Sequence, residues 1–311
     1  MFEIIYILIL AVVIDSVFGE PKNRFHPVAW LGKVIEMLFE NDFILKNKNK
    51  LFKKIYGAAF TLILMIACSF IIFEFLNLIL GYQVIIFMLV SAVILKFTFS
   101  IRGMGEHANA VLKELQSGDI GGARASVSML VSRDAEKLNE KQIVSATIES
   151  ISENMVDGVM SPVFYFTVAY LLVNSIPAAV SVAVGFRIIS TLDSMIGYRD
   201  KGFADLGWFS ARLDDAFNYI PARLSPVFFL NLDSIKIAAR DHRKTQSPNS
   251  GFPMAAAAGY LGVSLEKPGF YRIGDEKEKL KPEHIKTALG IMDRSIMIFI
   301  LFNTSLILLS I

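Results

Sequence analysis

The chain has 311 residues, of which 54% are hydrophobic, 25 are Phe and 19% are charged, with a formal net charge of +2. With a positive mean hydropathy, this composition lies outside the usage of soluble globular domains and predicts a polytopic membrane protein whose partner is the lipid bilayer. The single Cys68 excludes a disulfide framework. We expect no nucleic-acid partner.

Apolar segments that could cross about 30 Å of hydrocarbon recur along the chain. They lie at 3–18, 57–80, 83–100, 159–173, 177–189 and 291–311. The segment 177–189 is the shortest and would complete a hairpin with 159–173, so we expect five or six crossings. Strand-type alternation is absent, and the predicted fold class is therefore all-α. We expect one integral membrane domain, residues 1–311, whose polar, site-forming segments are 101–158, 190–224 and 233–290.

Lysine and arginine gather between the first two spans and again in the segment 233–290. By the positive-inside rule both segments are cytoplasmic, which predicts a multi-pass protein of the cell membrane with its active site facing the cytoplasm. The charges within the spans, Glu3, Asp15, Glu74 and Lys96, lie near span ends, where snorkelling accounts for them. A transporter would instead need polar residues inside several spans.

The first polar segment is predicted to contain three helices. Residues 102–116 have helical periodicity, 117–119 form a turn with an N-cap, and 120–131 form a second helix. A third helix opens at 138–140 and continues into the span that begins at 159. This organisation places the acidic end of the third helix next to the membrane.

Three acids at that end share one helical face. Glu149, Glu153 and Asp157 are spaced i, i+4, i+8, with Asn154 beside them. One interpretation is a solvated helix face. The other is a magnesium site, because a bound cation would relieve both the like-charge repulsion and the cost of placing an acid near hydrocarbon.

A second polar stretch alternates acids and bases among apolar residues. Its members are Arg187, Asp193, Arg199, Arg212, Asp214, Asp215, Asn218 and Arg223. On one helix Arg212 and Asp215 would be i, i+3, and Asp214 and Asn218 would be i, i+4. A structural salt bridge explains any single pair. The whole set favours phosphoryl-transfer chemistry, in which carboxylates hold a hard metal and arginines bind phosphate oxygens.

A third polar stretch is a loop of turn-forming residues, Ser247-Pro248-Asn249-Ser250-Gly251, ahead of Pro253 at the expected first helical position. A loop that feeds a helix N-terminus can bind an anion, although the chain contains no Walker loop. We expect a Gly251→Val variant to stay folded and to bind a phosphate-bearing substrate more weakly, because the new side chain would obstruct close backbone approach.

Several long motifs identify a resemblance to the CbiB/CobD family of membrane-bound adenosylcobinamide-phosphate synthases. They are "GEPKNRFHPVAWLGKVI", "ARASVSMLVSRDAEKL", "TIESISENMVDGVMSPVFYF", "TLDSMIGYRDKGFADLGWFSARLDDAFNYIPARL" and "SPNSGFPMAAAAGYLGV". Their order and spacing resemble the family from about Asp15 to about Gly274. Three departures are Glu20 in place of Asp, Phe252 in place of Trp, and Leu265–Pro268 in place of a glycine-rich ending.

The resemblance implies a ligase of cobalamin biosynthesis. Its substrates would be the corrinoid adenosylcobyric acid, which is not a bound cofactor, and (R)-1-amino-2-propanol or its O-phosphate. ATP and Mg²⁺ would be the cofactors. The amine's phosphorylation state, acceptance of ethanolamine, and association as a homo-oligomer or with later pathway enzymes stay open.

With the resemblance, the polar residues become candidate site residues. The predicted catalytic residues are Glu149, Glu153, Asn154, Asp157, Asp193, Asp214, Asp215 and Asn218. The predicted substrate- and phosphate-binding residues are His26, Arg133, Asp134, Arg187, Arg212, Arg223, Ser247, Asn249, Ser250 and Gly251. The predicted magnesium ligands are Glu153, Asp157 and Asp215, with Asp214 an alternative to Asp215.

Two alternatives compete with these assignments. For His26, substrate contact and helix capping are both open. For the whole chain, the alternative function is a membrane regulator or sensor resembling the β-lactamase-regulation branch of the same superfamily. Such a regulator should lack the paired acids and the Ser247–Gly251 loop, and this chain has both.

Overall fold

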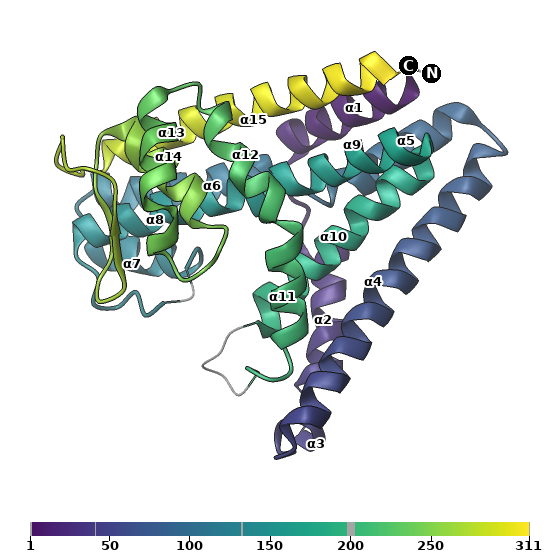
Figure 1. Ribbon diagram of the computed structural model, residues 1–311, viewed down its shortest axis with the longest axis horizontal. Coiled ribbons are helices and arrows are strands. Elements are labelled where there is room, and N and C mark those ends of the chain that lie inside the picture. Colours follow the sequence, from purple (N-terminus) through teal and green to yellow (C-terminus); the bar gives the residue numbers. More distant parts are fainter. Residues whose placement is uncertain (1, 41, 132, 198–202, 311) are drawn as a thin grey trace. The chain divides into compact units, whose positions relative to one another are not determined.

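The computed structural model describes residues 2–40, 42–131, 133–197 and 203–310 (Figure 1). Most of the described residues are helical and very few are in strands, which confirms the predicted all-α fold class. In chain order the elements are α1 (Glu3–Phe18), η1 (Asn23–Phe25), α2 (Pro27–Phe39), α3 (Asp42–Leu45), α4 (Lys50–Leu80), α5 (Val84–Lys96), α6 (Ile101–Gln116), α7 (Ile120–Ser128), α8 (Glu140–Met155), η2 (Val156–Met160), α9 (Ser161–Val173), α10 (Ile176–Ile196), α11 (Trp208–Phe217), α12 (Tyr219–Phe228), α13 (Leu232–Asp241), η4 (His242–Lys244), α14 (Gly251–Leu261), β1 (Leu265–Lys267), β2 (Tyr271–Ile273) and α15 (Glu283–Ser310).

Within the described ranges, five helical stretches are long and apolar enough to cross a membrane. They are Lys50–Leu80, Val84–Gln116, Glu140–Val173, Ile176–Ile196 and Glu283–Ser310. The predicted first span is α1, whose 16 residues reach only about 24 Å. Large apolar side chains stay exposed along α4, which suits contact with lipid rather than water. The chain is therefore a multi-pass helical membrane protein.

The chain divides into two compact units. Unit 1 comprises Met1–Ser100, Ser161–Phe217 and Asn303–Ile311, and unit 2 comprises Ile101–Met160 and Asn218–Phe302. The predicted polar segment 190–224 contributes to both units, and its residues 198–202 lie outside the described ranges.

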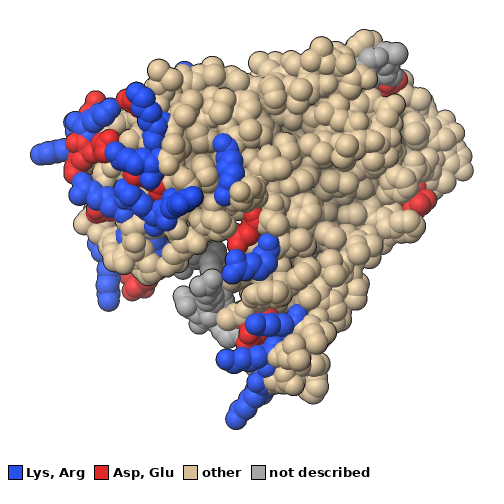
Figure 2. Space-filling view, viewed as in Figure 1, with Lys and Arg blue, Asp and Glu red and all other residues tan. Residues whose placement is uncertain are grey.

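In unit 1, α10 packs against α4 and α9, and α1 packs against α5. The α9–α10 pair is the hairpin predicted from the apolar segments. A buried cluster of Ile35, Phe39, Leu192 and Leu206 fixes α2 to the end of α10. Figure 2 shows that charged side chains of this unit gather near α3 and the start of α4, and that the surface farther along α4 is almost free of them.

In unit 2, α14 is the central helix. It packs against α8, α12 and α13, and Ala255, Ala256, Ala257 and Ala258 are all buried. Because alanine side chains are short, neighbouring helices can approach the α14 backbone closely. Of the remaining helices of the unit, α6 and α7 pack against each other and against α8.

Local capping explains why the helices of unit 2 begin where they do. The Asp119 side chain accepts a hydrogen bond from the Gly122 N–H at 2.9 Å and starts α7. Asn139 and Gln142 form a reciprocal capping box at the start of α8. Both starts were predicted, whereas α7 ends at Ser128 and not at residue 131.

A π-helical segment, Val156–Met160, separates α8 from α9. Pro162 provides the physical reason, because proline has no N–H to donate and its ring clashes with the carbonyl four residues earlier, at Gly158. The predicted continuous helix is thus interrupted at this point. Asp157 lies within the interruption.

The sequence did not predict the two short strands. β1 and β2 pair antiparallel with Leu265 opposite Ile273, and Gly269, with φ of 77°, lies in the connecting turn. Three-residue strands are too short to show alternation. The hairpin packs on α8, where the Glu266 N–H donates to Ser145 Oγ at 2.7 Å.

Candidate functional site

Glu149 is the centre of a buried hydrogen-bond network in unit 2 and is 5% exposed. Ser145 Oγ donates to its Oε1 at 2.6 Å. Its Oε2 accepts from Arg133 Nη2 at 2.9 Å and from Tyr271 Oη at 2.9 Å. The solvated-face interpretation is therefore wrong for Glu149, which instead holds Arg133 and Tyr271 in place.

Tyr271 comes from β2 and was not predicted as a site residue. Burial raises its pKa strongly, and the nearby negative charges of Glu149 and Glu153 raise the pKa further. The phenol therefore stays protonated and remains a hydrogen-bond donor. Glu153, one turn after Glu149 on α8, acts on Tyr271 through its charge.

The remaining residues of the acidic face diverge from the predicted stack. Glu149 and Glu153 keep their i, i+4 relationship within α8, but Asp157 lies in the π-helical segment, so the regular i+8 spacing is lost. Glu153 and Asp157 are both half-buried. The Asn154 side chain donates to the Ser150 carbonyl at 3.0 Å.

No group of three or more His, Cys, Asp or Glu side chains within the described ranges is arranged to hold a metal ion. Magnesium often binds through only one or two carboxylates, with waters and substrate phosphates completing its shell. The half-buried carboxylates of Glu153 and Asp157, on consecutive helical segments, suit that donor chemistry. Together with Asp215 in unit 1, they stay predicted ligands.

The loop before α8 carries Arg133 and Asp134. Asp134 is exposed and accepts a hydrogen bond from the Glu136 N–H at 2.9 Å, so it shapes the turn. Arg133 is mostly buried against Glu149. The structure thus gives these adjacent predicted residues different surroundings.

Unit 1 brings together three of the predicted residues from α10 and α11. Arg212 Nη1 lies 3.7 Å from Asp215 Oδ2, which confirms the predicted i, i+3 pair. The Asp215 carboxylate also interacts electrostatically with Asp193. Arg187 lies half-buried on α10, and Asp214 lies half-buried on α11.

Asp214 and Asn218 do not lie on one continuous helix, and the pairing of their side chains stays a prediction. Helix α11 ends at Phe217, and Asn218 is the buried residue that precedes α12 in unit 2. The chain therefore does not carry the two side chains on one continuous helix.

Arg223 is tied to the Ser247–Gly251 loop. Its Nη1 donates to Asn249 Oδ1 at 3.2 Å and to the Tyr219 carbonyl at 2.8 Å. Its guanidinium lies 4.7 Å from the centre of the Phe252 ring, whose other stacking partner is His242 at 4.2 Å. Arg223 thus stabilises the loop, and phosphate binding by Arg223 stays a prediction.

The loop itself is largely folded onto its own side chains. Ser247 Oγ accepts from the Asn249 and Ser250 N–H groups at 3.2 and 3.3 Å, and both of these residues are buried. Helix α14 begins at Gly251, so Pro253 is its third residue and not its first. Anion binding by Ser247, Asn249, Ser250 and Gly251 stays a prediction.

Gly251 has a packing role that the sequence did not reveal. A Cβ built there would lie 2.0 Å from the His242 carbonyl oxygen. This contact argues against the expectation that Gly251→Val stays folded, because a side chain would collide with backbone rather than with a ligand.

His26 caps α2 through Nδ1, which accepts from the Val28 N–H at 3.2 Å. This confirms the capping alternative. Because Nδ1 is an acceptor, Nε2 carries the proton and donates to Glu20 Oε2 at 2.6 Å. Burial alone would raise the pKa of Glu20, but hydrogen bonds from His26 and Lys96 lower it to about 2.

The snorkelling explanation for Asp15 and Lys96 is wrong. Both side chains are buried, and Lys96 Nζ lies 3.5 Å from Asp15 Oδ1 and 2.7 Å from Glu20 Oε2. The ends of α1 and α5 are therefore joined by a buried ion-pair cluster. The buried cation and the two carboxylates stabilise one another in surroundings where hydrocarbon could not solvate their charges.

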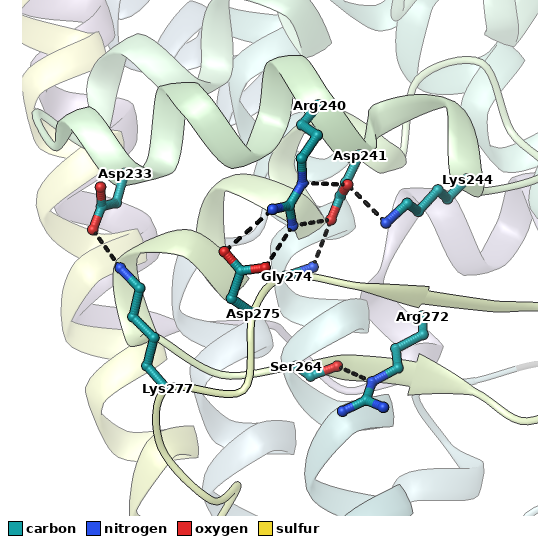
Figure 3. A network of polar contacts seen from close by, with 9 residues as sticks. All are labelled: Asp233, Arg240, Asp241, Lys244, Ser264, Arg272, Gly274, Asp275 and Lys277. Carbon is teal, nitrogen blue, oxygen red and sulfur yellow. Dashed lines mark hydrogen bonds and ion pairs between the residues drawn. The ribbon is translucent and has the colours of Figure 1, made fainter.

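A second charged cluster in unit 2 surrounds Asp241, which is fully buried (Figure 3). Asp241 accepts hydrogen bonds from Arg240 at 2.8 Å and from the Gly274 N–H at 2.8 Å, and it pairs with Lys244 at 2.8 Å. Arg240 also pairs with Asp275 at 2.9 Å. The cluster fixes the end of α13 to the turn after β2.

Comparison with known proteins gives the family. Residues 8–292 match the family model described as CobD/Cbib protein. The chain is 39% identical to the cobalamin biosynthesis protein CobD of Dehalococcoides mccartyi (strain CBDB1), over 98% of each chain. It is also 39% identical to the probable cobalamin biosynthesis protein CobD of Methanothermobacter thermautotrophicus, over 95% of each chain, and 36% identical to that of Pyrococcus furiosus, over 91% of each chain. No solved structure matches the chain. The chain therefore belongs to the CobD/Cbib protein family.

Proposed function

We propose that the protein is an enzyme of cobalamin biosynthesis that joins adenosylcobyric acid to (R)-1-amino-2-propanol or its O-phosphate in an ATP-dependent amide ligation. The names of its relatives support the pathway, and the resemblance found in the motifs supports the reaction. The same names do not favour a regulator of the β-lactamase-regulation branch. The observation that supports the chemistry is the Arg133–Glu149–Tyr271 network, because Glu149 of α8, the helix that also carries Glu153, holds the Arg133 guanidinium.

The reaction needs activation because a carboxylate does not react with an amine unless one of its oxygens leaves. In the proposed first step a carboxylate oxygen of the corrinoid attacks the γ-phosphorus of ATP, which forms an acyl phosphate and releases ADP. In the second step the amine nitrogen attacks the acyl carbon, phosphate leaves, and the nitrogen loses a proton. The product is adenosylcobinamide or its phosphate.

The protein's part in such chemistry is to position the substrates and to stabilise developing charge. Arg133 would bind phosphate oxygens, and Glu149 would keep its guanidinium in a fixed orientation. Glu153 and Asp157 would hold Mg²⁺. Mg²⁺, when bound, would neutralise part of the negative charge of the phosphates. Asp193, Asp214 and Asp215 of unit 1 stay predicted catalytic residues, and Asp215 stays a predicted magnesium ligand.

A direct assay tests this function. Purified protein in lipid nanodiscs is mixed with adenosylcobyric acid, Mg-ATP and either amine, and the products are identified by mass. We expect one amine to give an ATP-dependent corrinoid amide and stoichiometric ADP. Absence of any ATP-dependent corrinoid product with either amine, or with ethanolamine, would contradict the proposal.

We also propose that the site-bearing segments face the cytoplasm of a cell membrane, as the positive-inside rule implies. Single cysteines at Lys137 and Lys279, both exposed, in a Cys68→Ala background provide the test. An impermeant thiol reagent should label neither in intact cells and both after permeabilisation. Labelling of either one from outside would place that segment on the opposite face.

A further inference from the structure

One nitrogen of the buried Arg133 guanidinium is unsatisfied. Arg133 Nη2 pairs with Glu149, but Nη1 is inaccessible to solvent and has no hydrogen-bond partner among the described residues. The side chain as a whole is 14% exposed. Buried polar groups are nearly always hydrogen-bonded, so such an orphan donor calls for an explanation.

The two oxygens of the neighbouring Glu149 carboxylate do not provide a partner for Nη1. Both oxygens of Glu149 are already engaged, Oε1 by Ser145 and Oε2 by Arg133 Nη2 and Tyr271. Glu149 therefore holds the guanidinium through Nη2 and leaves Nη1 without a partner among the described residues. A purely structural ion pair with Glu149 is complete without Nη1, because Nη2 already makes the charge-assisted hydrogen bond.

We propose that Arg133 Nη1 binds a phosphate oxygen of a substrate, which makes the Arg133–Glu149–Tyr271 network a phosphate-binding subsite. The inference rests on the proposed function and deepens it by naming the subsite. A guanidinium held by a carboxylate on one side forms charge-assisted hydrogen bonds to an oxyanion on the other. Tyr271 supports it, because a phenol that stays protonated keeps donating to Glu149 and keeps that carboxylate in place.

The electrostatic surroundings restrict the ligand. Glu153 lies near Tyr271, so a bare polyphosphate would meet negative charge. A phosphate that arrives with a cation avoids this repulsion. Two substrates of the proposed reaction meet that condition: ATP as its magnesium complex, and aminopropanol phosphate, which carries its own ammonium group.

Binding measurements on variants test the subsite without relying on turnover. Dissociation constants for Mg-ATP and for 1-amino-2-propanol O-phosphate are measured by calorimetry in nanodiscs. Arg133→Gln alone would leave Glu149 as an uncompensated buried charge, so the principal variant is Arg133→Gln with Glu149→Gln. This pair is neutral, and its amides can hydrogen-bond to each other. The matched control is Arg102→Gln, which removes an exposed arginine from α6 in the same unit.

We expect the double variant to keep its melting temperature within a few degrees and to bind one of the two ligands about tenfold or more weakly, with the control unchanged. The ligand whose affinity falls is the source of the bound phosphate. If the double variant does not fold, Arg133→Lys replaces it. Lysine keeps the charge beside Glu149 but has a single nitrogen, which cannot pair with Glu149 and also occupy the position of Nη1, so the same loss is expected.

Three results would overturn the inference or separate it from the proposed function. A folded variant that binds both ligands within about twofold of wild type would show that Nη1 takes no phosphate. Wild-type protein that binds neither ligand would overturn both proposals. Wild-type protein that binds Mg-ATP in an Arg133-dependent way but forms no amide would uphold the subsite and overturn only the ligase reaction.

Discussion

Tyr271 donates its hydroxyl to Glu149 across 122 positions of the chain, at 2.9 Å. The hairpin that carries Tyr271 is also held to α8 by Ser145, which bonds both Glu266 and Glu149. One buried carboxylate thus joins the hairpin, the helix and Arg133. Loss of any of its donors should loosen the others.

Tyr271→Phe tests this coupling because it removes the hydroxyl and keeps the ring. Glu149 Oε2 would lose one of its donors, and we expect a loss of about 1–2 kcal/mol in the free energy of unfolding. Amide exchange in residues 265–273 should accelerate. The control is Tyr82→Phe, since Tyr82 is 83% exposed. Equal effects of the two substitutions on melting temperature and exchange would contradict the coupling.

Asp241 should make the stability of unit 2 depend on pH. Burial alone would raise its pKa, but hydrogen bonds from Arg240, Lys244 and the Gly274 N–H hold the pKa well below its usual range. An unfolded Asp titrates near about 3.9, so the stabilisation is present above that pH and is lost as pH falls through the lower folded pKa.

Asp241→Asn should therefore destabilise the protein most above about pH 4, and the difference from wild type should shrink in more acidic solution. We expect a loss of about 2 kcal/mol or more in the free energy of unfolding at neutral pH. The loss is smaller than for a fully buried ion pair, because Arg240 and Lys244 are half exposed and water offsets part of it. Denaturant unfolding at several pH values measures it. Asp42→Asn, on an exposed ion pair, is the control. A constant difference across pH would exclude this origin.

These long-range pairs also explain what the sequence could and could not predict. The starts of α7 and α8 depend on Asp119 and Asn139, whose capping partners lie three residues away, so a local pattern revealed them. Tyr271 and Asp241 act through partners that are 122 and 33 residues distant along the chain. Nothing in their local sequence indicates those contacts.

The snorkelling prediction for two charged residues within the apolar segments was wrong for a different reason. Asp15 and Lys96 each lie near the end of an apolar run, where an isolated charge normally reaches water. Only the packing of α1 against α5 shows that they meet each other. The π-helical segment, in contrast, had a local signal in Pro162, four residues after Gly158.

Lys96→Met should be strongly destabilising. It would leave Asp15 and Glu20 without the cation that they share, and removal of one partner from a buried pair costs about 3–5 kcal/mol. Adding Asp15→Asn should recover part of the loss, because one of the two carboxylates then no longer needs a cation. The yield of folded protein and the melting temperature in detergent are the measurements. Lys46→Met, on an exposed pair, is the control, and no recovery in the double variant would contradict the shared-cation interpretation.

Gly251→Ala should destabilise unit 2, because its Cβ would lie 2.0 Å from the His242 carbonyl oxygen. The matched control is Gly105→Ala in α6, where a Cβ meets nothing within 4 Å. Alanine favours a helix interior over glycine by about 0.5–1 kcal/mol, so the control should be neutral or stabilising. Melting temperatures that shift alike for both variants would contradict the packing role of Gly251.

Substitutions of Glu153 and Asp157 distinguish most sharply between a catalytic and a structural role for these acids. If they hold magnesium, replacing a carboxylate by its amide preserves size and shape but removes a charge that the metal needs. Glu153→Gln and Asp157→Asn should then each lower turnover by about a hundredfold or more and raise the magnesium concentration required. Because Glu149 and Glu153 both act as negative charges on Tyr271, Glu153→Gln should meanwhile leave the melting temperature unchanged or slightly higher.

Glu140→Gln, at the exposed start of α8, is the matched control and should keep normal turnover and magnesium dependence. The same amide substitution at Asp215 in unit 1 extends the test to the third predicted ligand. Near-normal turnover in both Glu153→Gln and Asp157→Asn, with higher stability, would show that these acids are only a solvated helix face. The magnesium assignment would then be abandoned, while membership of the CobD/Cbib protein family, which rests on the whole chain, would be unaffected.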